Sequence, residues 1–150
     1  MARWGMTQTL PIQMLNRSYL ALLEVCDQLE AIADSLPNSV SAGDCGRLAA
    51  EIVDLLARTH REEEATLLHM LASSQRPELR QLASRLRGEH DYDDNAVIEV
   101  RDALLSLSTR RPLHSPDATG YLLRSFFESL RRHVLAEQDL LAILADQSAR

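Results

Sequence analysis

Hydrophobic residues recur along most of the chain at spacings of three and four, the pattern of helices that bury one face. Four such segments are predicted, over residues 11–36, 44–72, 78–108 and 116–146. The gaps between them carry helix-breaking or capping residues, among them Pro37, Pro77 and the pair Ser115-Pro116. Because these loops are short, neighbouring helices are expected to run antiparallel. The sequence therefore predicts an all-α, up-down-up-down antiparallel four-helix bundle.

The length of the chain fits a single bundle. It has 150 residues, enough for one domain with one hydrophobic core. Residues 1–9 are expected to form an N-terminal extension and residues 10–147 the bundle. The two cysteines, Cys26 and Cys45, are expected to be free thiols rather than a disulfide.

Composition and charge exclude several classes of function. Hydrophobic residues make up 45% of the chain and charged residues 25%, as in ordinary globular proteins. The net charge of -6 and the lack of a basic run argue against nucleic-acid binding. No run of apolar residues is long enough to predict a membrane span. The first residues lack the apolar stretch of a secretory signal, so a cytoplasmic location is expected.

Two short motifs place a histidine and a carboxylate one helical turn apart on a stripe that is otherwise apolar. They are His60-Arg-Glu-Glu-Glu64 and His133-Val-Leu-Ala-Glu137, and His90 lies on a third apolar stripe. Residues four apart share one helix face, so each pair is expected to point into the bundle. Buried polar groups without partners are costly. The pattern therefore favours a metal site inside the bundle, built from facing helices.

The same residues have a plainer interpretation. Exposed pairs four residues apart contribute only about 0.2–0.5 kcal/mol, and many helices contain them. A single inward histidine such as His90 is often a hydrogen-bonded core residue. In the run Glu62–Glu64, two of the three glutamates are expected to be solvated or beside the site, with Glu64 facing inward. Two pairs together with a third histidine favour metal ligation over this alternative.

With these motifs the chain resembles the hemerythrin-like family, the HHE cation-binding domains, over about residues 10–146. Bacterial members carry His, His-x-x-x-Glu, His and His-x-x-x-Glu on their successive helices. The resemblance implies a hemerythrin-like bundle that binds one or two non-haem iron ions, with zinc or no metal as alternatives. It also implies the metal ligands, which are His60, Glu64, His90, His133 and Glu137.

One family ligand, the histidine of the first helix, has no counterpart. An internal repeat that superposes the two His-x-x-x-Glu motifs places Asn16 at that position, and Tyr19 follows one turn later. Three outcomes stay open: the Tyr19 phenolate replaces the histidine, water fills the position, or fewer metals bind. Asp94, one turn after His90, is a candidate additional ligand or a neighbour of the site.

The function implied by the resemblance is that of a cytoplasmic protein that binds or senses O2, NO or iron, or acts in a stress response. A binding protein is expected rather than an enzyme, although an oxidase or peroxidase at an open iron position is a third interpretation. The expected partner is a small diatomic ligand or iron, with no nucleic acid and no membrane, in a monomer or a homodimer. The alternative is a degenerate, metal-free hemerythrin-like bundle that serves as an interaction or regulatory module, which the missing first-helix histidine supports.

Overall fold

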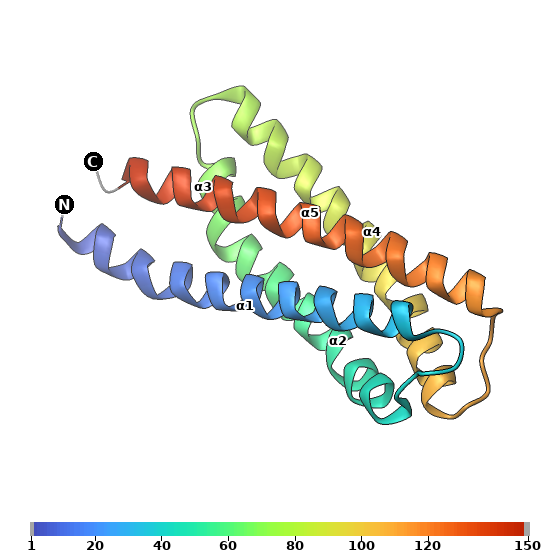
Figure 1. The fold of residues 1–150 in the computed structure, drawn as a ribbon. Helices are drawn as coiled ribbons and strands as arrows, with labels where there is room; N and C mark the ends of the chain where they lie inside the picture. The colour runs from blue at the N-terminus through green and yellow to red at the C-terminus, as the bar shows by residue number, and fades with distance from the viewer. Residues whose placement is uncertain (1, 149–150) are drawn as a thin grey trace.

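The computed structural model describes residues 2–148, and within them the chain is helical apart from short loops. The helices are α1 (Ala2–Ser35), α2 (Ala42–Glu63), η1 (Glu64–Leu68), α3 (His69–Ala72), α4 (Pro77–Ser108) and α5 (Pro116–Ser148). Because α2, the π-helical turn η1 and α3 follow one another without a break, the chain forms four long helical rods (Figure 1). The described residues contain no strand, and the predicted all-α four-helix bundle is confirmed.

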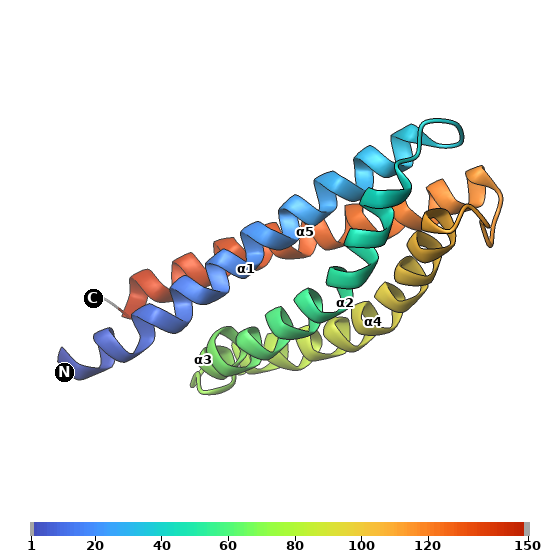
Figure 2. The ribbon, with the colours of Figure 1, turned by 90° about the horizontal axis from the view of Figure 1, so that it is seen from below.

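Successive rods run in opposite directions and associate mainly as two pairs. Figures 1 and 2 show α1 beside α5, and α2 beside α4. Arg124 pairs with Asp34 at 2.7 Å and Arg131 pairs with Asp27 at 2.9 Å, so two ion pairs connect α1 with α5. Exposed pairs of this kind contribute at most about 1 kcal/mol each. The packing of the apolar faces therefore has to supply most of the stability.

The helix ends agree with the predictions at one loop and differ at the start of the chain. Ser115 caps α5, because its Oγ accepts a hydrogen bond from the backbone N–H of Ala118 at 3.1 Å. The predicted start of the first helix near Pro11 is wrong, since α1 begins at Ala2 and carries Pro11 inside it. A proline within a helix removes one backbone hydrogen bond, and the helix continues past it here.

The core follows the predicted apolar stripes of all four rods. Among its fully buried side chains are Leu15, Tyr19, Leu29, Ile52, Leu56, Leu67, Leu71, Val97, Leu104 and Leu123. Cys26 and Cys45 are buried and free, as expected. None of the helices in the described part of the chain has the length and hydropathy needed to cross a membrane. Near the middle of the bundle, polar side chains replace the apolar ones, and these form the candidate site.

Candidate metal centre

Three buried side chains from two helices form the centre of this polar cluster. His60 and Glu63 belong to α2 and His90 belongs to α4, and one ligand atom of each lies within 4.8 Å of the others. Glu63 is 1% exposed and His90 is 6% exposed. Two atoms bound to one ion at about 2.1 Å can be at most about 4.2 Å apart. Small side-chain movements would therefore let all three atoms bind the same ion.

The other two rods each add a polar group to the cluster. Glu137 of α5 approaches His90, with 4.0 Å between its Oε1 and the Nε2 of the histidine. Tyr19 of α1 is fully buried, and its hydroxyl lies close to Glu63 and Glu137. All four rods therefore contribute to one buried polar cluster, as metal sites in helical bundles require.

The buried polar atoms of the cluster have few partners. Among the described residues, Tyr19 Oη has no hydrogen bond, and Glu63 Oε2 and His90 Nε2 have only their close ion-pair contact with each other. A buried polar group without a partner costs about 1–3 kcal/mol, and native interiors contain few of them. The convergence of these three atoms on one place fits a metal ion, which would bind a lone pair of each.

Two aspartates of α4 orient two of the histidines. The Nδ1 of His60 donates a hydrogen bond to Oδ1 of Asp94 at 2.8 Å, and the Nδ1 of His133 donates to Oδ2 of Asp93 at 3.2 Å. A carboxylate on one ring nitrogen fixes the tautomer and leaves the other nitrogen for a metal. The ring of His60 also stacks on that of His90, with centroids 4.0 Å apart. Asp94 therefore positions His60 rather than entering the cluster itself.

Burial and mutual contact shift the pKa values of the acidic groups in opposite directions. Burial, and next the charge of Glu63, raises the pKa of Tyr19. Burial and contact with Glu63 also raise the pKa of Glu137 far above its ordinary value of 4.5. Burial alone would raise the pKa of Glu63, but contacts with His90 and Glu137 outweigh burial and lower it. In the metal-free protein Glu63 is therefore ionised while Glu137 keeps its proton.

The pKa values of the two stacked histidines are also shifted in opposite directions. Burial and the neighbouring His90 lower the pKa of His60, which favours the neutral imidazole that binds metals. Burial opposes ionisation of His90 as well, but contact with Glu63 outweighs it and raises the pKa of His90. The metal-free centre therefore holds a His90–Glu63 ion pair, which a metal cation would replace.

The protonation of Glu137 predicts how the stability of the metal-free protein depends on pH. Since its pKa is higher in the folded than in the unfolded chain, folding takes up a proton above about pH 4.5, and stability falls as the pH rises. Glu137→Gln removes this proton uptake. The variant is expected to melt about 2–4 °C above the parent at pH 8, for a gain of about 1 kcal/mol, with a smaller difference at pH 5. Thermal melts with chelator at both pH values test this, and an equal shift at both would contradict it.

The fold and this cluster together define a four-helix-bundle protein with a candidate cation site. A family model for the hemerythrin HHE cation-binding domain matches residues 10–144. The chain therefore belongs to the hemerythrin HHE cation-binding family, and the resemblance found in its sequence is confirmed. A search of the curated proteins and a search of the solved structures each gave no match.

The structure places Glu64 outside the cluster, so the prediction that it faces inward is wrong. Its side chain is 45% exposed, and its Oε1 accepts a hydrogen bond from the Nε of Arg87 at 3.1 Å. Glu63 ends α2 and continues its buried stripe, which passes through Leu56 and Thr59, whereas Glu64 begins the π-helical turn η1. Glu63 therefore occupies the inward position in place of Glu64. π-Helical turns occur frequently at functional sites.

The sequence itself indicates that Glu63 faces inward, although the His-x-x-x-Glu spacing points to Glu64. Leu67 and Leu71 are buried, and the position four residues before Leu67 is Glu63. Glu63 also lies three residues after His60, a spacing that shares a helix face as well as four does. The apolar stripe that follows the motif therefore identifies the inward glutamate more accurately than the His-x-x-x-Glu spacing.

The remaining candidates differ in whether their side chains face the cluster. Asn16 is exposed, so its predicted place beside the site is wrong. The inward stripe of α1 passes through Leu15 and Tyr19, and Asn16 is about 100° further around the helix than Leu15. The prediction that Tyr19 faces inward is confirmed. His133 is 30% exposed and lies at the edge of the cluster, bound to Asp93.

Replacing the carboxylate that orients His60 is expected to weaken metal binding. In Asp94→Asn the charged acceptor of the imidazole N–H is lost, and metal affinity should fall by about 10- to 100-fold. Asp91→Asn is the matched control, because Asp91 is an exposed residue of the same helix. Competition titrations with a coloured chelator measure both affinities. Equal affinities for the two variants would show that Asp94 does not position the histidine.

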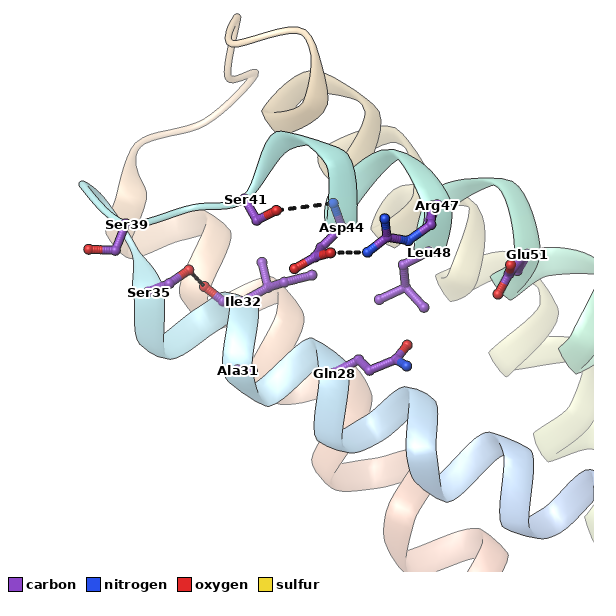
Figure 3. Close-up of a pocket in the computed structure, with 10 residues that line it drawn as sticks. All are labelled: Gln28, Ala31, Ile32, Ser35, Ser39, Ser41, Asp44, Arg47, Leu48 and Glu51. Atoms are coloured by element: carbon purple, nitrogen blue, oxygen red, sulfur yellow. Dashed lines mark hydrogen bonds and ion pairs between the residues drawn. The ribbon is translucent and has the colours of Figure 1, made fainter.

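A separate cavity of about 400 Å³ lies between the end of α1 and the start of α2 (Figure 3). Several of its polar groups are already paired. The Oγ of Ser41 accepts a hydrogen bond from the backbone of Asp44, Arg47 pairs with Asp44, and Ser35 donates to the carbonyl of Ile32. The cavity is open to solvent and leaves these groups satisfied, in contrast to the cluster, so it is not part of the metal centre.

Proposed function

We propose that this protein binds non-haem iron at the central cluster, with His60, Glu63 and His90 as the principal ligands. The convergence of ligand atoms from these three residues in the interior carries the proposal. Two histidines and one carboxylate form a ligand set that suits non-haem Fe(II) and leaves coordination positions open. Glu137 beside the cluster and His133 at its edge supply donors for a second ion, so the proposal includes a di-iron centre.

We further propose that the iron serves to bind or sense O2 or NO, in a stress response, rather than to turn over a larger substrate. Bound iron supplies affinity for such diatomic molecules. The chain supplies the enclosure, because the fully buried Leu15, Leu56 and Leu67 lie one turn from Tyr19, His60 and Glu63. An apolar shell of this kind limits the access of water to a metal. The cytoplasmic location, the diatomic partner and the monomeric or dimeric state stay predictions.

The metal content of the purified protein tests the first part of this proposal. Protein from iron-supplemented cells is expected to carry one or two iron ions per chain by elemental analysis, and His90→Ala is expected to lose them. Addition of NO under anaerobic conditions should then change the visible and electron paramagnetic resonance spectra of the parent only. A folded, helical parent that carries no transition metal would refute the proposal and leave the metal-free alternative. Zinc in place of iron would refute the choice of iron but leave the metal site in place.

A further inference from the structure

Core packing does not explain why the hydroxyl of Tyr19 is buried. Its side chain is 0% exposed, yet its hydroxyl has no hydrogen bond among the described residues. Buried tyrosine hydroxyls normally find a partner, because burying one without a partner is unfavourable. A phenylalanine would fill almost the same space without this cost. The hydroxyl therefore indicates a partner that binds there.

The surroundings of the hydroxyl identify the chemistry of that partner. It lies close to Glu63 and Glu137, the two buried carboxyl groups of the cluster, and shares the cluster with the His90–Glu63 ion pair. The other buried polar side chain described on α1, Ser18, is already engaged, since its Oγ donates to Glu62 at 2.7 Å. Tyr19 is thus the group through which α1 reaches the cluster, and its hydroxyl lies near two carboxyl groups.

We propose that Tyr19 is a metal ligand as its phenolate, and that this ligand makes the centre prefer trivalent over divalent ions. The proposal rests on the proposed function, because it needs a metal in the cluster. When the ion binds, the hydroxyl of Tyr19, the carboxyl of Glu137 and the imidazolium of His90 each release a proton to solvent, as groups that coordinate a strongly charged cation do. Tyr19, Glu63 and Glu137 then offer three anionic oxygens, which match the charge of a trivalent ion. His60 and His90 add two neutral nitrogens.

Two phenylalanine variants test the ligand directly. Tyr19→Phe removes only the hydroxyl from the cluster. Tyr92→Phe is the matched control, because Tyr92 belongs to the same helix as His90 but is exposed. Each protein is loaded with Fe(III), with Ga(III) as a redox-inert trivalent ion, and with Zn(II). Three spectroscopic and analytical quantities are measured: the metal content, the visible phenolate-to-iron absorption band, and the near-ultraviolet tyrosinate difference on Ga(III) binding. The affinities for Ga(III) and Zn(II) are measured as well.

Tyr19→Phe is expected to lose the visible band and the tyrosinate signal, and to lose at least about tenfold in Ga(III) affinity. Its Zn(II) affinity should change only about twofold to threefold, which also shows that the variant folds. Tyr92→Phe should match the parent in every measurement. Metal binding with the same spectra and affinities in parent and Tyr19→Phe would overturn the role of Tyr19 and leave the metal proposal intact. Loss of the band in Tyr92→Phe would overturn it too. Absence of any bound metal in the parent would overturn the proposed function itself.

Discussion

Glu63→Gln is expected to lower metal affinity by about a hundredfold or more, whereas Glu64→Gln should keep it within about twofold. Glu63 is buried with a carboxylate oxygen in the cluster, and glutamine keeps the shape of the side chain but removes its charge. Glu64 is exposed and pairs with Arg87 on the surface. Losing that ion pair should cost at most about 1 kcal/mol of stability and leave the cluster intact.

The comparison is informative because the two residues are neighbours of the same type. Competition titrations with a coloured chelator give both affinities, and circular dichroism shows that both variants keep their helices. The opposite order of affinities would mean that the α2–η1 segment rearranges when a metal binds. Glu64 would then point inward, and the assignment of Glu63 as the ligand would be contradicted.

The fold could be predicted from the sequence because most of its determinants are local. The spacing of apolar residues identified the inward face of each rod, and residues such as Leu29, Ile52 and Leu104 are buried as that spacing predicts. The Ser115-Pro116 pair marked the start of α5, and its cap forms as expected. The helical segment 2–9 was missed because Pro11 suggested a helix start, although a helix can continue through a single proline.

The site could be predicted only in part, because its last details depend on tertiary contacts. The burial of His60, His90 and Glu137 follows from helical periodicity, and the structure agrees. The choice between Glu63 and Glu64 depends on how α2 is rotated in the bundle and on Arg87 of another rod, neither of which the spacing of the motif reveals. The sequence repeat likewise could not show which residue of α1 enters the cluster, because similarity between helices does not fix their rotation.

Loading the protein with its metal is expected to raise its melting temperature by about 8–16 °C. A ligand held at about a thousand times its dissociation constant stabilises the folded state by about 4 kcal/mol. For a chain of this length, each kcal/mol shifts the melting temperature by about 2–4 °C. The structural reason is that only the folded chain brings the ligand atoms of His60, Glu63 and His90 together for the ion. The same shift should disappear when a chelator is added.

Thermal melts of metal-loaded and chelated protein measure this shift, and Glu63→Gln is the control because its melting temperature should hardly respond to metal. The metal-free alternative predicts the reverse pattern. If the cluster were only a remnant of a lost site, metal would leave the melting temperature of the parent unchanged, and replacing His90 by leucine would leave stability unchanged or raise it. If the ion is a ligand, His90→Leu abolishes the metal-dependent shift, whatever it does to the metal-free protein. The metal-dependent shift in melting temperature therefore distinguishes a site that binds metal from one that has lost this ability, because burial of the side chains alone cannot produce the shift.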